Sequence, residues 1–228
     1  MSSPRRDRDV TGPDDTPGAL IKAAERLMSQ RGVEAVSLRE ITRTAGARNT
    51  MALAYHFKDR AGLVRAILDR HAAGVEAARH ALLDDYEKNG SDDVRALAAA
   101  LVRPLAAKLS DPDNGPQYLQ IYAELFHRAD PIILEAPLTD EADSIFRWRK
   151  LLEPLLDQVQ RQTHQRYAAA LYTFVELSRR ARDAPHTDDS FFVSHLIDMV
   201  TGLLTAEMSE ETRSLAAERG HRRTVRGT

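Results

Sequence analysis

Residues 37–57 read SLREITRTAGARNTMALAYHF. The stretch opens with Ser37 and has Glu40 three residues later, a spacing that is typical of a capping box at the start of a helix. Apolar residues then recur at helical spacing until Gly46, which is placed to end that helix. Another short helix is expected over 48–53. The stretch therefore predicts two short helices joined by a turn that contains glycine.

A longer helix is expected on each side of this stretch. Upstream, Thr16 and Pro17 supply an N-cap and a proline for the first helical position, and Gly32 is placed to end the helix. Downstream, Asp59 can cap a long helix over 60–86. Three helices with a tight turn before the third are the layout of a helix-turn-helix DNA-binding domain, which we expect over residues 16–62.

Charge is unevenly distributed along the chain. The 228 residues carry a formal net charge of -2. Residues 16–65 hold nine basic and four acidic side chains, which leaves +5, whereas residues 66–228 carry -6. This asymmetry favours a DNA-binding head joined to an acidic body.

The rest of the chain predicts an all-α fold, because helical periodicity and helix-breaking residues alternate and no long period-two pattern occurs. We expect about nine helices in all. Those after the head are expected near 91–110, 115–128, 139–160, 163–182 and 188–209. The predicted divisions are a disordered arm over 1–15, the helix-turn-helix domain over 16–62, a dimerisation and effector-binding domain over 63–209, and a flexible tail over 210–228.

The turn and the third helix hold the candidate base-reading residues. Arginine can read guanine, asparagine can read adenine, and threonine can contact either a base edge or a thymine methyl group. Arg48, Asn49 and Thr50 supply these three side chains in a row. On the preceding helix, Arg39 and Arg43 lie four residues apart and can point together at phosphate.

A set of motifs between Ala19 and Leu63 occurs in a characteristic order and spacing. The pieces are Ala23-Ala24 through Gly32, Ser37 to Ile41, Ala45-Gly46, Tyr55-His56-Phe57, Arg60 and Leu63. Together they resemble the N-terminal domain of the TetR family of bacterial transcriptional regulators, in particular members with an Arg-Asn pair and a Tyr-His-Phe triplet. The resemblance implies a homodimer that binds double-stranded DNA, and Tyr55, His56 and Lys58 complete the expected DNA-binding residues.

Two features depart from the family pattern. Ala54 stands where the family usually has a phosphate-contacting tyrosine, and the segment from Gly46 to Phe57 is one residue longer than usual. Structural roles also remain open for these side chains: the aromatic residues as core, His56 as a structural histidine, the helix arginines as a solvated face, and residues 48–50 as turn and cap residues.

The last two predicted helices are apolar on more than one side. A helix of this kind must bury two faces, which an intersubunit four-helix bundle would do; a single thick core is the alternative. The candidate interface residues are Tyr167, Leu171, Phe174, Phe192, Leu196, Met199 and Leu203.

Aromatic residues also cluster in the middle helices. The family resemblance implies a small-molecule effector pocket there, and ligand sites are generally apolar with a few polar anchors. Ordinary core packing is the alternative role. The candidate lining residues are Tyr118, Tyr122, Phe126, Phe146 and Trp148.

Other classes of function find little support. The chain has no cysteine, no nucleophile elbow, phosphate loop or zinc motif, and no histidine pairs four residues apart, so we expect no enzyme, metal or cofactor. It also lacks a signal-like apolar segment and an 18-residue apolar run, and a cytoplasmic location is expected. The expected function is a DNA-binding transcriptional repressor controlled by a small molecule. The alternative is an all-α dimeric ligand-binding or adaptor protein that has lost DNA binding, which Ala54 and the longer turn would support.

Overall fold

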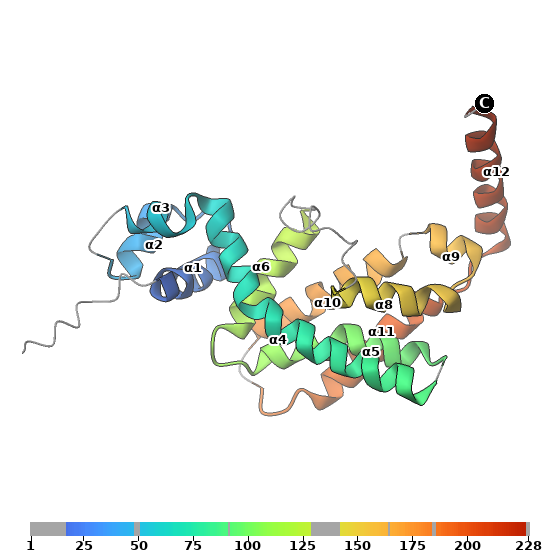
Figure 1. Cartoon of the computed structure of the whole chain (residues 1–228), viewed down its shortest axis with the longest axis horizontal. Helices are drawn as coiled ribbons and strands as arrows, with labels where there is room; N and C mark the ends of the chain where they lie inside the picture. The colour runs from blue at the N-terminus through green and yellow to red at the C-terminus, as the bar shows by residue number, and fades with distance from the viewer. Residues whose placement is uncertain are drawn as a thin grey trace, which may run out of the picture. The chain divides into compact units, whose positions relative to one another are not determined.

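The computed structural model describes residues 17–47, 51–90, 92–128, 142–163, 165–183 and 186–226. Within these ranges the chain forms eleven α-helices and two short 3-10 helices and no strand, so the predicted all-α class is confirmed and the helices exceed the nine expected (Figure 1). The chain divides into two compact units, Met1–Arg70 and His71–Thr228. The predicted arm over 1–15 lies outside the described residues.

Unit 1 contains three helices and the start of a fourth: α1 (Pro17–Arg31), α2 (Leu38–Thr44), α3 (Ala52–Phe57) and α4 (Arg60–Asn89). Both α2 and α3 contact α1, and they contact each other. Gly32 ends α1 with a φ of 92°, the left-handed conformation expected of a helix-terminating glycine. The core of the unit consists of Leu20, Ala24, Met28, Ile41, Leu53, Leu63, Val64 and Ile67, all buried.

Unit 2 is built from the rest of α4 and the helices that follow it. Its α10 packs against α6 and α11, and α11 packs against α5, which also contacts α8. Buried leucines, isoleucines and valines from these helices form its core. The helices are α5 (Val94–Ala106), α6 (Gly115–His127), α8 (Ser144–Leu152), α9 (Gln158–Gln162), α10 (Gln165–Arg182), α11 (Ser190–Thr205) and α12 (Glu210–Arg226).

The single helix predicted over 139–160 is interrupted. After α8, residues Glu153–Leu155 form a 3-10 turn, and α9 then begins afresh. Pro154 lacks the amide hydrogen that a continuing helix needs. Asp157 starts α9 with a capping box to Gln160, so the chain supplies both a stop and a new start.

The segment predicted as a flexible tail forms helix α12 over most of its length. Ser209 Oγ accepts a hydrogen bond from the amide of Thr212 at 3.2 Å, which caps the helix. Glu210 and Glu211 occupy the first turn, where negative charge complements the helix dipole. These local signals make the segment helical although it has little apolar periodicity.

Among the described helices, none alone is both long and apolar enough to cross a membrane. Ser190–Thr205 and Glu210–Arg219, which are bent by 55° relative to each other, meet the length and composition criteria only as a pair.

Candidate nucleic-acid interface

The N-terminus of α2 is capped as the sequence predicts, but only in part. Ser37 Oγ accepts a hydrogen bond from the amide of Glu40 at 3.2 Å. The Glu40 carboxylate does not complete the capping box, because its Oε1 accepts a 2.5 Å hydrogen bond from Arg31 Nη1 at the end of α1. The guanidinium is the stronger partner for a carboxylate, and the ion pair ties α2 to α1.

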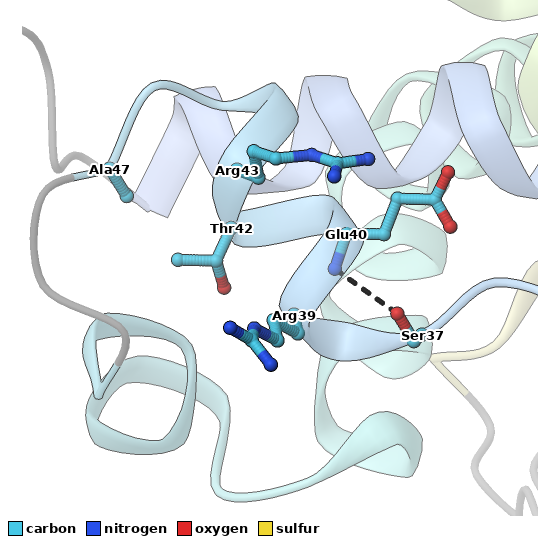
Figure 2. Close-up of a pocket in the computed structure, with 6 residues that line it drawn as sticks. All are labelled: Ser37, Arg39, Glu40, Thr42, Arg43 and Ala47. Atoms are coloured by element: carbon cyan, nitrogen blue, oxygen red, sulfur yellow. Dashed lines mark hydrogen bonds between the residues drawn. The ribbon is translucent and has the colours of Figure 1, made fainter.

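Two arginines of α2 are exposed, as expected for phosphate-contacting residues. They do not converge: the guanidinium groups of Arg39 and Arg43 extend in different directions from the helix (Figure 2). Between them Thr42 is buried and its hydroxyl donates to the carbonyl of Leu38 at 2.9 Å. The two cations therefore fit two separate phosphates better than one.

An open depression of about 610 Å³ lies on this side of α2. Its lining includes two arginines, which suits an anionic partner, and one carboxylate, Glu40, which is paired with Arg31. The lining residues are Ser37, Arg39, Glu40, Thr42, Arg43 and Ala47 (Figure 2).

Helix α3 begins later than the sequence predicts. The short helix expected over 48–53 is found at Ala52–Phe57, so the Tyr55-His56-Phe57 triplet lies within the helix and does not follow it. Phe57 and Leu53 point into the core, because they are buried four residues apart. The predicted base-reading residues Arg48, Asn49 and Thr50 lie outside the described residues.

The outer face of α3 presents Tyr55, with 85% of its surface exposed, and His56 beside it. The two rings meet edge to face with their centroids 5.0 Å apart. Met51, at the N-cap, is 65% exposed and lies four residues before Tyr55 on the same face. Met51 is not among the residues predicted from the sequence. The signal was its spacing of four residues from Tyr55, which puts both on the side of the helix opposite the inward-facing Leu53 and Phe57.

A tight turn at Lys58 joins α3 to α4. Lys58 has φ 66° and ψ -61°, and the amide of Asp59 donates to the carbonyl of Phe57 at 2.8 Å. This is a γ-turn of the rare positive-φ form, which is strained for a residue other than glycine. It holds the Lys58 side chain, which is exposed, at the end of α3.

Gly62 allows this turn to close. A Cβ atom at position 62 would lie 1.9 Å from the carbonyl oxygen of Phe57, too close for any side chain. The amide of Gly62 also donates to Asp59 Oδ1 at 2.8 Å, which caps α4. The end of α3 is thus fixed directly against the start of α4.

The contacts of Arg60 give a structural reason for the basic residue that follows the aromatic triplet. Its Nη1 and Nη2 donate to the carbonyls of Val33 and Val36 at 2.5 and 2.7 Å. Arg60 therefore fastens the α1–α2 connection to α4 and has a structural role. A second tie is the buried Glu25 on α1, whose Oε2 accepts a 2.9 Å hydrogen bond from Arg70 on α4.

In unit 2, the predicted pocket aromatics of α6 lie in one aromatic cluster, in which Tyr118 and Tyr122 meet edge to face with ring centroids 5.7 Å apart. Tyr118 stacks on His71 of α4 with ring centroids 4.6 Å apart, and Tyr122 stacks on Phe174 of α10 at 4.1 Å. Phe126 stacks on Tyr167 at 5.0 Å. The structure thus brings Tyr118, Tyr122 and Phe126 together.

The two pocket candidates on α8 are placed differently. Trp148 is buried, and its indole nitrogen donates to the carbonyl of Leu97 at 2.8 Å. Phe146 is half-buried, with the Lys150 ammonium 5.6 Å from its ring centroid. Trp148 therefore packs α8 against α5, and Phe146 is the more accessible of the two.

A buried arginine lies next to the α6 tyrosines, and sequence reasoning missed it. Arg79 is 3% exposed, and its Nη1 donates to Ser144 Oγ at 2.7 Å and to Glu76 Oε1 at 3.3 Å. Burial lowers the pKa of Arg79 from its ordinary value, and the Glu76 carboxylate opposes that shift. Burial also raises the pKa of Tyr118 and of Tyr122. Spacing was the available signal, because Arg79 lies four residues from the buried Val75 and Leu83.

The dimer candidates separate into two groups. Phe174 and Leu196 are buried within the core of their own subunit, so they are not available to a partner. Met199 is 43% exposed, and Phe191 on the same helix, which was not among the candidates, is 84% exposed. The remaining candidates are at least partly exposed: Tyr167, Leu171, Phe192 and Leu203.

Within the described residues, no three histidine, aspartate or glutamate side chains come together in a way that could hold a metal ion.

Residues 20–67 match the model of the N-terminal domain of bacterial regulatory proteins of the tetR family. Among curated protein sequences, none matches this chain.

Three solved structures illustrate the structural similarities. A tetR-family transcriptional regulator from Rhodococcus sp. is 22% identical and has a TM-score of 0.47, covering 81% of this chain and 98% of that one. A tetR-family regulator from Mesorhizobium loti MAFF303099 is 15% identical with a TM-score of 0.44, covering 83% and 95%. RolR in complex with resorcinol is 18% identical with a TM-score of 0.42, covering 85% and 95%.

Proposed function

We propose that the protein is a dimeric, sequence-specific transcriptional repressor of the tetR family, because residues 20–67 match the N-terminal domain of bacterial regulatory proteins of that family. Unit 1 binds duplex DNA, and unit 2 forms the dimer and takes up a small-molecule effector that controls DNA affinity. The family match agrees with the expectation that the protein is a regulator and not an enzyme.

The observation that carries the DNA-binding role is the outer surface of α2 and α3. A core of buried leucine, isoleucine and phenylalanine holds these helices on α1, while Tyr55, Arg39 and Arg43 project outward. Tyrosine and arginine of this kind contact phosphates and fix the register of a reading helix in the major groove. Arg48, Asn49 and Thr50 precede α3 in the chain and are proposed to read bases.

The dimer proposal is supported by the exposed apolar side chains of α10 and α11. Phe191 and Met199 on α11 and Tyr167 on α10 are large hydrophobic residues exposed in the single subunit. Exposed apolar side chains of this size mark interaction surfaces, and a two-fold dimer would bury the same set from both subunits. Two paired heads would read half-sites about one helical turn apart.

The effector proposal rests on the aromatic cluster of α6 and α10 together with the buried polar groups beside it. Aromatic side chains with a few polar anchors are typical of small-molecule sites. Effector binding would need to shift operator affinity by about 1–3 kcal/mol to give useful control.

Fluorescence anisotropy with DNA from upstream of the protein's own gene tests the function. The wild-type dimer should bind this DNA in preference to a shuffled duplex. Tyr55→Ala should weaken binding about tenfold or more, because it removes an exposed contact without touching the core. The matched control is Arg26→Ala, which removes an exposed cation from α1. Equal binding of both duplexes, or equal loss in both variants, would contradict the proposal.

A further inference from the structure

Arg79 is a charged side chain held in the interior of unit 2. Its two hydrogen bonds, to Ser144 Oγ and Glu76 Oε1, both start from Nη1. The Nε atom, on another edge of the guanidinium, is buried and has no hydrogen-bond partner among the residues that the structure describes. Buried polar groups are nearly always paired, so this donor requires an explanation.

The charge of Arg79 is only partly balanced by Glu76. Their separation of 3.3 Å is longer than the roughly 2.7–2.9 Å of a strong charge-assisted hydrogen bond. The other Glu76 oxygen, Oε2, accepts a 2.8 Å hydrogen bond from the amide of Ser144 at the start of α8. The Glu76 carboxylate is thus shared between two partners. The guanidinium of Arg79 stays protonated, so it can still bind a further anion.

Two tyrosines of α6 lie near Arg79, in addition to the carboxylates of Glu76 and Asp143. Tyr118 and Tyr122 interact electrostatically with Arg79, and Tyr122 stacks on Phe174. Both hydroxyls stay protonated at neutral pH, because burial raises their pKa. The site therefore offers one cation beside aromatic rings, with two carboxylates, Glu76 and Asp143, near that cation. Asp143 is already engaged, because its Oδ1 accepts hydrogen bonds from the amides of Ile145 and Phe146 at 2.7 and 3.0 Å at the start of α8.

We propose that Arg79 binds the carboxylate of a small apolar organic acid, and that such acids are the effector class of unit 2. The inference rests on the proposed function in taking unit 2 as the effector-binding part. The carboxylate would accept from the Nε edge of the guanidinium, the planar arrangement in which arginine recognises carboxylates. The apolar body of the acid would pack on the tyrosine rings.

The test compares acids with their uncharged amides on the wild-type dimer. Benzoate, phenylacetate and octanoate are each titrated beside benzamide, phenylacetamide and octanamide. Binding is followed by the fluorescence of Trp148, the sole tryptophan, which lies one helical turn after Ser144 on α8. At least one acid should bind about tenfold or more tightly than its amide, because only the acid forms a charge-assisted pair. Equal binding of every acid and amide, or no binding of any acid below about 1 mM, overturns the proposal.

Two arginine variants show whether the preference belongs to Arg79. Arg79→Met keeps the length of the side chain but removes the guanidinium, and should abolish the preference for acid over amide. Arg103→Met removes an exposed cation from α5 and should leave the preference for acid over amide unchanged. A preference that survives in Arg79→Met overturns the assignment. If Arg79→Met does not fold, the comparison of acids with amides on the wild type still decides the ligand class.

Operator binding is measured in parallel, so that a failure of the proposed DNA-binding function can be told apart from a failure of the Arg79 site. A wild-type protein that prefers acids but binds no DNA would contradict the proposed function and leave the Arg79 site standing. A protein that binds its operator but shows no preference for acids would contradict the Arg79 site alone.

Discussion

At the scale of single residues, Lys58 combines backbone strain with a charge at the proposed DNA surface. Its positive-φ γ-turn is a conformation that glycine adopts without penalty. We expect Lys58→Gly to stabilise the protein by about 1 kcal/mol and to weaken DNA binding, because the strain and the cation are both removed. Urea denaturation and anisotropy measure the two effects.

Lys58→Ala is the matched control, since it removes the charge but keeps a Cβ in the strained conformation. It should weaken DNA binding as much as the glycine variant without the gain in stability. Equal stability of the glycine and alanine variants would contradict the strain at this turn.

Gly62 tests how α3 is held in place. Gly62→Ala puts a Cβ 1.9 Å from the carbonyl of Phe57. The clash involves backbone, so α3 must move, and we expect a loss of about 1–3 kcal/mol in the free energy of unfolding together with weaker DNA binding. Gly18→Ala, on α1, meets no atom within 4 Å and should be neutral or slightly stabilising. Similar stabilities for the two variants would show that the contact is absent.

At the scale of elements, the exposed side of α11 should determine the oligomeric state. Met199→Asp places a charge on the proposed interface, where burial without a partner is unfavourable. We expect a monomer at micromolar concentration by size-exclusion chromatography with light scattering, and a loss of operator affinity because the paired heads separate.

Leu215→Asp, which changes an exposed leucine of α12, provides the comparison and should remain a dimer. A Met199→Asp protein that stays dimeric would place the interface elsewhere.

The sequence predicts elements well where local chemistry marks their ends. Gly32 and Ser37 end and begin helices as expected, because a left-handed glycine and a side-chain cap act within one turn. The bounds of α3 are harder to predict. Its N-cap, Met51, makes no side-chain cap hydrogen bond, and its end depends on the Lys58 turn and on the space that Gly62 leaves for the Phe57 carbonyl.

The site is less predictable than the fold, because its members are selected by tertiary contacts. The burial of Phe174 follows from its stacking on Tyr122, a residue far away in the chain. The spacing of Arg79 from Val75 and Leu83 places it on the buried face of α4, but its partner Ser144 lies 65 residues away in the chain and could not be predicted. Glu40 turns to Arg31 for the same reason, since a charged neighbour from another helix outcompetes the local backbone.

At the scale of the whole molecule, the uneven charge distribution should make DNA binding depend strongly on salt. Residues 16–65 carry a net +5 although the chain carries -2. The logarithm of the affinity should fall linearly with the logarithm of the salt concentration, by about 0.9 for each phosphate neutralised. Because Arg39 and Arg43 point in different directions, Arg39→Ala should reduce that slope by about 1 without changing the preferred sequence. An unchanged slope would show that Arg39 does not contact a phosphate.

The central claim is that two copies of unit 1, joined through unit 2, bind one DNA duplex. Footprinting of the DNA upstream of the protein's own gene tests it most directly. We predict two protected half-sites related by two-fold symmetry, with centres about one helical turn apart on the same face of the duplex, and no footprint with Tyr55→Ala at the same concentration. A single unpaired site, or no protection by the wild-type dimer at low salt, would contradict the account.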